Sequence, residues 1–309
     1  STYAGSGSAG FLNGTLTSAR FNYPTDIAWH QPTKTLYVAD RNNHRIRRIV
    51  GGKVSTLAGS GSTGLLNGKG TAARFYYPEG IAVAQDGTVY VGDTSNHAIR
   101  RITAAGLVTT LAGSNSAGYV NQKGAAARFN SPRGLVVMTD GALLVADSSN
   151  HRLRRVTLSG VASLFAGTGS AGFTNGATTT ARFYYPYDVA VAAGGSIVVA
   201  DSSNYRVRRV AAGKVSTLAG SGSLGFVDGA PTSARFNRPM GITSDVQGRV
   251  WISDYYNHRV RVIGVSAAAC DDSSACTIDS CNKSKGCVFK AKTTGTVCSD
   301  GNACTSADT

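Results

Sequence analysis

Acidic, amide and imidazole side chains recur as one group along this chain of 309 residues. Asp40 is followed by Asn43 and His44, and the same three positions return four more times at intervals of about 54 residues. The aspartates are Asp40, Asp93, Asp147, Asp201 and Asp254, and the asparagines are Asn43, Asn96, Asn150, Asn204 and Asn257. The third position is filled by His44, His97, His151, Tyr205 and His258. Carboxylates and imidazoles are common metal ligands and proton carriers, so this group is the first candidate for chemistry.

The repetition of this group favours a structural role over a catalytic one. A reacting substrate needs unlike groups held asymmetrically around it, whereas here one set is copied five times. A ring of imidazoles on a metal ion is the alternative, and Tyr205 interrupts that ring. An aspartate at the start of a Ser- and Asn-rich turn typically accepts hydrogen bonds from backbone N–H groups. We therefore predict that the aspartates and asparagines stabilise turns and that the histidines are half-buried residues that close them.

Side chains beside a repeated proline differ from copy to copy, as a ligand-binding site requires. The repeated prolines are Pro24, Pro78, Pro132, Pro186 and Pro239. The side chains that follow them within two positions include Asp26, Glu79, Arg133, Asp188 and Met240. Asp26, Glu79, Arg133 and Asp188 form the candidate ligand site. The sequence contains no phosphate-binding loop, no His-Glu-x-x-His motif and no Gly-x-Ser-x-Gly motif, and we predict no resident metal or cofactor.

All six cysteines lie near the end of the sequence, at Cys270, Cys276, Cys281, Cys287, Cys298 and Cys304. This clustering predicts a boundary between residues 1–266 and a Cys-rich segment at 267–309. An even number of cysteines in a short polar segment predicts disulfide bonds, because such a segment cannot build an apolar core. Zinc is the alternative, but the spacing lacks Cys-x-x-Cys pairs and nearby histidines.

Disulfide bonds predict an oxidising location, outside the cell or on its surface. The glycosylation sequons at Asn13 and Asn282 agree with that location. The sequence from Cys270 to Cys276 is repeated from Cys298 to Cys304, so we expect one cysteine module and a truncated second copy. The pattern is similar to the short tandem cysteine modules of secreted and surface proteins.

The repeated unit also indicates the elements that position these side chains. In the second copy, short apolar segments are separated by turn residues, and we predict strands at 80–84, 88–92, 98–102 and 108–112. Four antiparallel strands in about 54 residues are typical of one blade of a β-propeller. The phenylalanine after the repeated arginine, Phe75 in this copy, is predicted to fill the space between blades.

The repeats resemble those of NHL-repeat β-propellers. The resemblance rests on the Ala-Arg-Phe-x-x-Pro block and on the pattern Ala-Asp-x-x-Asn-His-Arg-Ile-Arg at Ala39–Arg47, and it covers residues 1 to about 265. It implies an all-β propeller with four-stranded blades: five blades, or six if one more repeat precedes Ser1. We favour five blades and predict that Ser1–Gly5 pairs with the last blade and closes the ring.

The formal net charge of +14 predicts an acidic partner if the charge is concentrated on one surface. Some NHL propellers inside cells hold RNA on a basic face, but the cysteine segment argues against a nucleic-acid partner. Acidic glycans fit an extracellular location better. No run of eighteen apolar residues exists, so no membrane span is predicted.

These observations lead to one main hypothesis and two alternatives. A rigid propeller joined to a cross-linked segment predicts a non-enzymatic extracellular structural or interaction protein that assembles into a fibre, filament or surface structure. Its predicted partners are other copies of itself or surface and matrix proteins. The resemblance implies two alternatives: a metal-dependent lyase or lactonase-like hydrolase with its site in the propeller channel, and an RNA-binding NHL propeller.

Overall fold

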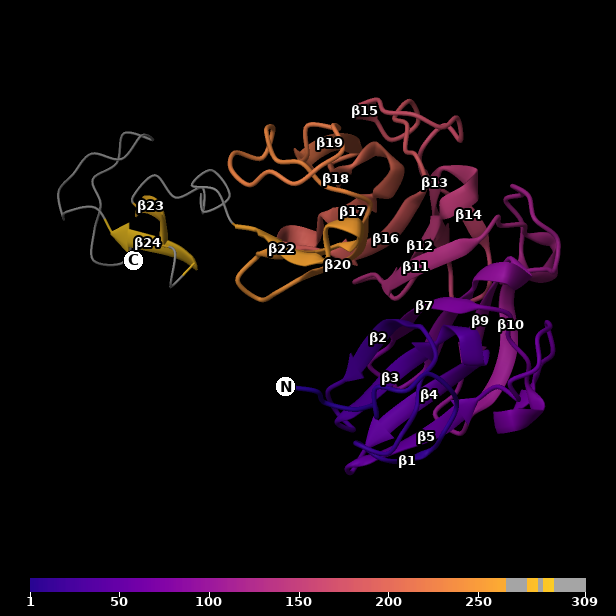
Figure 1. Ribbon diagram of the computed structural model, residues 1–309. Helices are drawn as coiled ribbons and strands as arrows, with labels where there is room; N and C mark the ends of the chain where they lie inside the picture. The colour runs from indigo at the N-terminus through magenta and orange to yellow at the C-terminus, as the bar shows by residue number, and fades with distance from the viewer. Residues whose placement is uncertain (265–276, 283–285, 292–309) are drawn as a thin grey trace.

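Five antiparallel β-sheets follow one another along the chain and surround a central channel as the blades of a propeller (Figure 1). The computed structural model describes residues 1–264, 277–282 and 286–291. Among the long strands of each blade, the one nearest the channel comes first in the sequence, and each later strand pairs with the one before it. The predicted all-β propeller with five blades is therefore confirmed.

The strands recur in the same order in every blade. The first blade contains β2 (Pro24–His30), β3 (Thr35–Asp40), β4 (Arg45–Val50) and β5 (Lys53–Ala58), with the short β1 (Gly14–Thr15) beside β5. The second contains β7 (Pro78–Val83), β8 (Val89–Asp93), β9 (Ala98–Ile102) and β10 (Leu107–Gly113), with β6 (Gly68–Lys69) beside β10. The third contains β11 (Pro132–Val137), β12 (Leu143–Asp147), β13 (Arg152–Val156) and β14 (Ala162–Ala166).

The last two blades differ from each other at the rim. The fourth contains β16 (Pro186–Val191), β17 (Ile197–Asp201), β18 (Arg206–Ala211) and β19 (Lys214–Ala219), with β15 (Gly176–Ala177) beside β19. The fifth contains β20 (Pro239–Ser244), β21 (Val250–Asp254) and β22 (Arg259–Ile263). The described residues of the fifth blade thus form three strands where the other blades have four or more.

A short 3-10 helix connects the second and third strands of every blade. These helices are η1 (Arg41–Asn43), η3 (Thr94–Asn96), η5 (Ser148–Asn150), η7 (Ser202–Asn204) and η8 (Tyr255–Asn257); elsewhere lie η2 (Gly70–Ala72), η4 (Gly124–Ala126) and η6 (Ala193–Gly195). Each connecting helix ends at the repeated His or Tyr, which adopts a left-handed backbone conformation, for example φ 53° at His44. Residues other than glycine rarely adopt this conformation, so its recurrence at the repeated His or Tyr shows that the turn has one defined shape.

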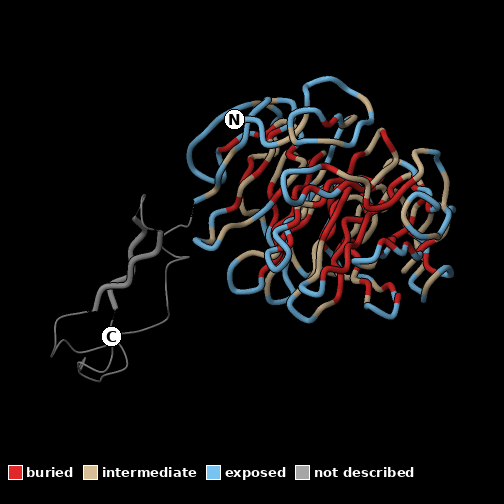
Figure 2. Tube along the Cα trace, turned by 90° about the horizontal axis from the view of Figure 1, so that it is seen from below, coloured by how far each residue is buried: buried red, intermediate tan, exposed pale blue. Residues whose placement is uncertain are grey.

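The core lies between neighbouring blades, where apolar side chains of two sheets pack against each other. Figure 2 shows the buried residues concentrated inside the molecule, with exposed residues mainly in the outer loops. In a blade that has a neighbour on each side, the second strand is covered on both faces. In the second blade, for example, all five residues of β8 are buried. Phe75, Phe129 and Phe183 are fully buried between blades, as predicted, and Phe236 is nearly so. Phe21, the equivalent residue of the first blade, is only half-buried.

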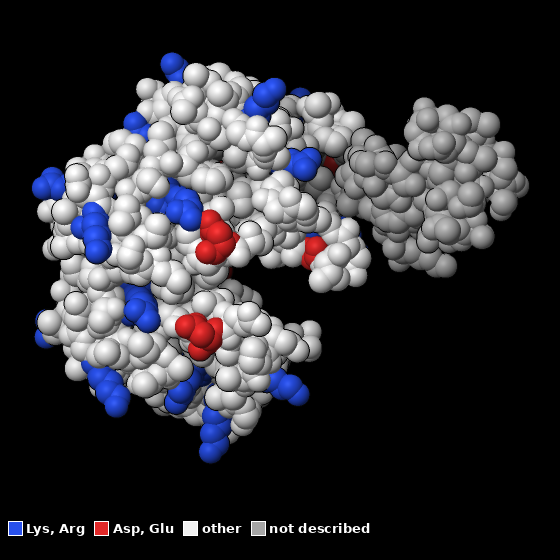
Figure 3. All heavy atoms as spheres, turned by 180° about the vertical axis from the view of Figure 1, so that it is seen from behind, with Lys and Arg blue, Asp and Glu red and all other residues white. Residues whose placement is uncertain are grey.

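The ring is open between the first and fifth blades (Figure 3). We predicted that Ser1–Gly5 would pair with the last blade. Instead, Gly5 and Ser6 donate backbone hydrogen bonds to Leu16 and Ala19 of their own repeat. Among the residues that the structure describes, β22 pairs only with β21. The prediction of ring closure by this segment is therefore wrong for the isolated chain.

A separate hairpin lies in the Cys-rich segment, formed by β23 (Thr277–Asn282) and β24 (Gly286–Ala291). Cys281 and Cys287 are opposite each other in its register, and Asn282 is the last residue of β23. Cys270, Cys276, Cys298 and Cys304 lie outside the described residues, so the predicted disulfides stay a prediction. In the described part of the chain, no helix has the length and apolar content to span a membrane.

Candidate functional site

Each repeated aspartate is the centre of a buried hydrogen-bond cluster. In the first blade, Asp40 Oδ1 accepts the Asn22 backbone N–H at 2.8 Å. Its Oδ2 accepts Asn43 Nδ2 at 2.8 Å and Arg47 Nη1 at 2.6 Å. Arg47 is fully buried and donates further bonds to carbonyl oxygens of the loop before β2. The cluster therefore ties that loop to β4.

The same cluster recurs in the other four blades. The aspartates are Asp93, Asp147, Asp201 and Asp254; their asparagines are Asn96, Asn150, Asn204 and Asn257; and their arginines are Arg100, Arg154, Arg208 and Arg261. The second arginine of each doublet, such as Arg48 or Arg101, lies closer to solvent. The partner N–H, however, does not come from the turn that we predicted. It comes from a residue 17 or 18 positions earlier.

The repeated histidines connect each blade to the next. The Nδ1 atoms of His44, His97 and His151 accept backbone N–H groups of Tyr77, Ser131 and Tyr185, respectively, at 3.0–3.2 Å. Burial lowers the pKa of these three histidines, so the neutral imidazole that accepts such a bond is favoured. The half-buried position predicted for the histidines is observed at His44, His97 and His151, whereas His258 is exposed. The hydrogen bonds of the first three give their repetition a structural reason.

The four predicted ligand-site residues do come together at the mouth of the central channel. Asp26, Glu79, Arg133 and Asp188 line one pocket of about 430 Å³, although they come from four different blades. They meet because each follows the proline that opens the innermost strand of its blade, and these strands surround the channel. Residues Met240, Tyr187, Arg41, Tyr23 and Tyr255 also line this pocket.

Glu79 is the most buried carboxylate of the channel mouth. Its Oε1 accepts Arg41 Nε at 3.0 Å, and its Oε2 lies 3.1 Å from Arg133 Nη1. The Tyr187 hydroxyl donates a further hydrogen bond to Oε2 at 3.0 Å. Burial and the negative charge of Glu79 raise the pKa of Tyr187, which keeps this hydroxyl protonated. Two cations and one hydroxyl therefore satisfy Glu79 within the protein.

Asp26 and Asp188 act as bridges between blades. Each carboxylate accepts one N–H from its own strand and one from the innermost strand of the next blade: Asp26 bonds Ile81, and Asp188 bonds Ile242. Burial, followed by the negative charge of Asp188, raises the pKa of Asp26. Burial also raises the pKa of Asp188, to about 7. The site therefore holds two carboxyl groups that retain protons to unusually high pH.

This arrangement limits the chemistry available at the channel. Among residues 1–264 and the two strands beyond them, no three His, Cys, Asp or Glu side chains are placed to hold a metal ion. Both oxygens of Asp26 and both oxygens of Asp188 accept backbone N–H groups. The sequence reasoning missed Tyr187 and Arg41. Tyr187 occupies the same position after proline as Glu79, and that equivalence is the signal that could have found it.

The predicted glycosylation position in the first repeat lies at the surface. Asn13 is exposed, and its Oδ1 accepts Arg47 Nη2 at 2.8 Å. The basic side chains on the face shown in Figure 3 are spread around the ring and do not gather into one patch. This distribution gives no support on that face to the concentrated basic surface that nucleic acid requires.

Comparisons with known proteins agree with this description. The NHL repeat model matches residues 21–49, 75–102, 129–155, 183–210 and 236–263, and a Dictyostelium (slime mold) repeat model matches residues 269–292. The protein SUPPRESSOR OF QUENCHING 1 of Arabidopsis thaliana is 29% identical in an alignment of 296 residues that covers 89% of this chain and 28% of that protein. NHL repeat-containing protein 2 of Gallus gallus is 28% identical over 286 residues, 80% of this chain and 39% of that protein.

The chain thus spans only 28–39% of the length of these relatives. Two solved structures share its fold. A chain of a nidogen/laminin complex has a TM-score of 0.55 and 17% identity, covering 81% of this chain and 76% of that one. A gluconolactonase of Xanthomonas campestris has a TM-score of 0.53 and 17% identity, covering 75% and 70%. From its five matched repeats and its five blades, this chain belongs to the NHL-repeat family of β-propellers.

Proposed function

We propose that this protein is a non-enzymatic extracellular interaction scaffold, which binds copies of itself and surface or matrix proteins to build a fibre, filament or surface layer. One observation carries this proposal: tyrosine side chains are exposed around the channel mouth. Tyr23 is 68% exposed, and Tyr184, Tyr185, Tyr255 and Tyr256 are also exposed. Tyrosine is enriched in the energetically important parts of protein interfaces, because it buries a large area at a small entropic cost.

The tyrosines are presented at one end of a rigid support. Tyr184 and Tyr185 directly precede the strand β16, and Tyr255 and Tyr256 begin η8, which follows the strand paired with β20. Both pairs therefore lie at the end of the blades where the innermost strands begin. The ring of Tyr185 packs against His151 with centroids 4.7 Å apart, so its position is fixed before any partner binds.

Several further observations support an extracellular scaffold. The channel carboxylate Glu79 is satisfied by internal partners, and the repeated aspartates serve to hold the ring together. A chain of the nidogen/laminin complex has the same fold, which supports a role in protein–protein association. The six cysteines support secretion, because unpaired cysteines at this density are unusual for such a short segment. Acidic glycans are additional partners that the net charge of +14 favours.

Sedimentation velocity of the non-reduced full chain tests this proposal. We expect species larger than a monomer that increase with protein concentration and diminish in the variant Tyr255→Ser/Tyr256→Ser. Leu158→Ser is the matched control, since Leu158 is equally exposed in the turn between β13 and β14 and should not matter. A chain that stays monomeric at every concentration would refute self-assembly.

A second function is favoured by the carboxyl pair at the channel. Asp26 and Asp188 line a pocket large enough for a small molecule, and a gluconolactonase shares the fold. A lyase or lactonase-like hydrolase would use these two residues as proton donor and acceptor. Hydrolysis of gluconolactone with and without added divalent cations, lost in Asp26→Asn and Asp188→Asn but kept in Leu158→Ser, would establish this function instead.

A further inference from the structure

Two arginines from different blades share one carboxylate at the mouth of the channel. Arg41 belongs to η1 of the first blade, and Arg133 belongs to β11 of the third. Both contact Glu79 of the second blade, whose side chain is only 4% exposed. The two arginine side chains remain 31% and 29% exposed, and they line the pocket of about 430 Å³. A buried carboxylate therefore holds two accessible cations in place.

These contacts leave N–H donors of both guanidinium groups available, because an arginine carries five of them. Arg41 donates from Nε to Glu79 and from Nη1 to Asn42, and its Nη2 bonds to no described residue. Arg133 contacts Glu79 through Nη1 and forms no other ion pair with the described residues. The pocket can therefore offer hydrogen bonds from two sides to one further acceptor.

Aromatic rings fix the orientation of both arginines. The Cζ atom of Arg41 lies 4.4 Å from the centroid of the Tyr77 ring, and that of Arg133 lies 4.4 Å from the centroid of the Tyr187 ring. The Tyr187 hydroxyl also bonds Glu79 at 3.0 Å, so ring, carboxylate and cation hold one another. A side chain that is already ordered loses little conformational freedom when it binds a ligand. The two arginines are thus positioned for an anion before one arrives.

The charges at the channel mouth leave a positive excess. Two arginines contact the single carboxylate of Glu79. The oxygens of Asp26 and Asp188 already accept backbone N–H groups. Burial also raises the pKa of both aspartates, which reduces their negative charge at neutral pH. The pocket therefore favours an anionic ligand over a neutral or cationic one.

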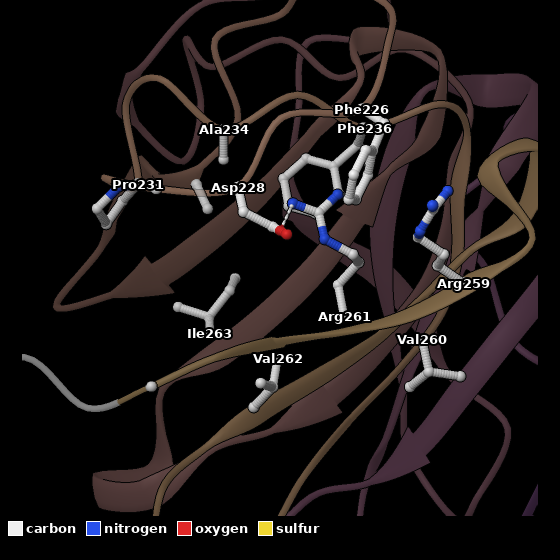
Figure 4. Close-up of a pocket in the computed structure, with 13 residues that line it drawn as sticks. Phe226, Asp228, Pro231, Ala234, Phe236, Arg259, Val260, Arg261, Val262 and Ile263 are labelled. Carbon is white, nitrogen blue, oxygen red and sulfur yellow. Dashed lines mark ion pairs between the residues drawn. The ribbon is translucent and has the colours of Figure 1, made fainter. Parts of the chain in front are cut away.

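The pocket of about 670 Å³ beside β22 contains an arginine with the opposite balance of charge (Figure 4). There Arg261 Nη2 lies 2.6 Å from Asp228 Oδ1, and Nη1 lies 2.9 Å from Asp254 Oδ2. Two carboxylates thus compensate one cation, whereas one carboxylate is shared by two cations at the channel mouth. The excess of positive charge belongs to the arginine pair around Glu79 and is not common to the arginines of this chain.

We propose that the channel mouth binds a uronic acid residue of an acidic glycan, with the carboxylate of the sugar held by Arg41 and Arg133. Arginine forms charge-assisted and often bidentate hydrogen bonds with carboxylates. A carboxylate is favoured over a sulfate group because the same two arginines already bind that of Glu79. Tyr23 and Tyr255 line the same pocket with exposed rings, whose flat faces can pack against the C–H groups of a sugar.

The size of the pocket agrees with this ligand, because its volume of about 430 Å³ lies in the range of small-molecule sites. The inference names the binding site for the acidic glycans and rests on that part of the proposed function. It is independent of self-assembly, which concerns protein partners.

An NMR titration of the non-reduced full chain with D-glucuronate tests the site. We expect saturable binding, and D-glucose, which lacks the carboxylate, should bind at least about tenfold more weakly. Arg133→Gln should weaken the binding of glucuronate by about the same factor, since it removes one of the two cations. The matched control is Arg101→Gln, which removes an exposed arginine outside the pocket and should leave the affinity unchanged.

The comparison of the two sugars on the unsubstituted chain does not depend on the folding of any variant. Arg41→Gln is a second variant with the same expected loss, and thermal unfolding shows whether each variant is folded. Equal affinities for glucuronate and glucose would overturn the inference. It would also fail if folded Arg133→Gln and Arg41→Gln bound glucuronate as Arg101→Gln does, or if the unsubstituted chain did not bind it.

Sedimentation velocity of the same samples separates this site from the proposed self-assembly. A chain that assembles but does not bind glucuronate refutes the site and leaves self-assembly standing. A chain that binds glucuronate through Arg41 and Arg133 but stays monomeric refutes self-assembly and leaves the site standing.

Discussion

At the scale of single residues, each repeated Asp–Arg pair buries two charged groups. The cost of removing these charges from water is offset by the many hydrogen bonds that the two groups make. Asp93 and Arg100 are both fully buried, with 2.7 Å between Oδ2 and Nη1. Burial raises the pKa of Asp93 to about 6, while Arg100 and the N–H of Tyr76 lower it. Removing one partner of such a pair leaves a buried charge without compensation.

The first prediction concerns this pair. Replacing Arg100 by Met should lower the free energy of unfolding by about 3–5 kcal/mol, because Asp93 would lose its countercharge. The neighbouring substitution Arg101→Met is the control, since Arg101 is exposed, and it should change stability by less than about 0.5 kcal/mol. Urea unfolding followed by tryptophan fluorescence measures both. Similar stabilities of the two variants would show that the clusters do not hold the blades together.

The second prediction concerns pH. Because burial raises the folded-state pKa of Asp188 to about 7, from a usual value of 3.8, the folded protein binds more protons than the unfolded chain between these values. The group's contribution to stability is thus fully present below pH 3.8 and is lost as pH rises through 7. Asp188→Asn removes this dependence.

Its stability relative to the unsubstituted protein should therefore improve by about 1–2 kcal/mol between pH 5 and pH 8. Thermal unfolding of both proteins across this range provides the measurement. A difference between them that does not change with pH would mean that Asp188 has an ordinary pKa.

The roles of individual residues could be predicted from sequence only where the five repeats could be compared with one another. Five copies of Asp, Asn and Arg indicated a structural cluster, and the variation after each proline brought Asp26, Glu79, Arg133 and Asp188 to one place. The donors to the aspartates could not be found, because they lie 17 or 18 residues away and their position depends on how the loop crosses the blade. The pairing of Tyr187 with Glu79 depends on the width of the channel, which no local pattern specifies.

At the scale of elements, neighbouring innermost strands meet either through a glycine in close contact or through an aspartate that bridges them by hydrogen bonds. Gly80 contacts the backbone of Arg133, and Gly134 contacts Asp188, so no side chain fits between these strands. Asp26 and Asp188 occupy the same position in their own blades and bridge to the next strand with their carboxylates. Glycine thus permits close packing of neighbouring strands, and aspartate spans a junction through hydrogen bonds.

The third prediction follows from this close packing. Gly134→Ala should destabilise the protein by about 1–3 kcal/mol, because the added methyl group would overlap Asp188. Gly241→Ala is a matched control at the equivalent position of the fifth blade, where Ser253 Oγ is the nearest atom outside the adjacent residues, at 3.2 Å from the new Cβ. Its effect should be smaller. Thermal unfolding tests the difference, and equal effects would contradict the account of strand packing.

Strand positions were predicted within one or two residues in the second blade, since turns and apolar alternation are local signals. The partner of the first strand-like segment was not predictable by the same means. Ser1–Ala4 has the sequence of an outer strand, but Gly5 and Ser6 bond to Leu16 and Ala19 of the same repeat. Which strand such a segment pairs with depends on contacts between blades, which no local pattern specifies.

At the scale of the whole molecule, exposed tyrosines lie at one end of a rigid set of blades. Tyr23 is 68% exposed, and Tyr255 and Tyr256 are each 50% exposed. Tyrosine is enriched in the energetically important parts of protein interfaces. The central claim is therefore the proposed self-assembly through this end of the propeller.

Electron microscopy of the native, non-reduced protein tests this claim most directly. We expect ordered filaments built of ring-shaped subunits. The variant Tyr255→Ser/Tyr256→Ser should disperse them into single rings, whereas Leu158→Ser should leave them intact. Single rings in the unsubstituted protein, under conditions in which the chain is folded and its cysteines are oxidised, would contradict it.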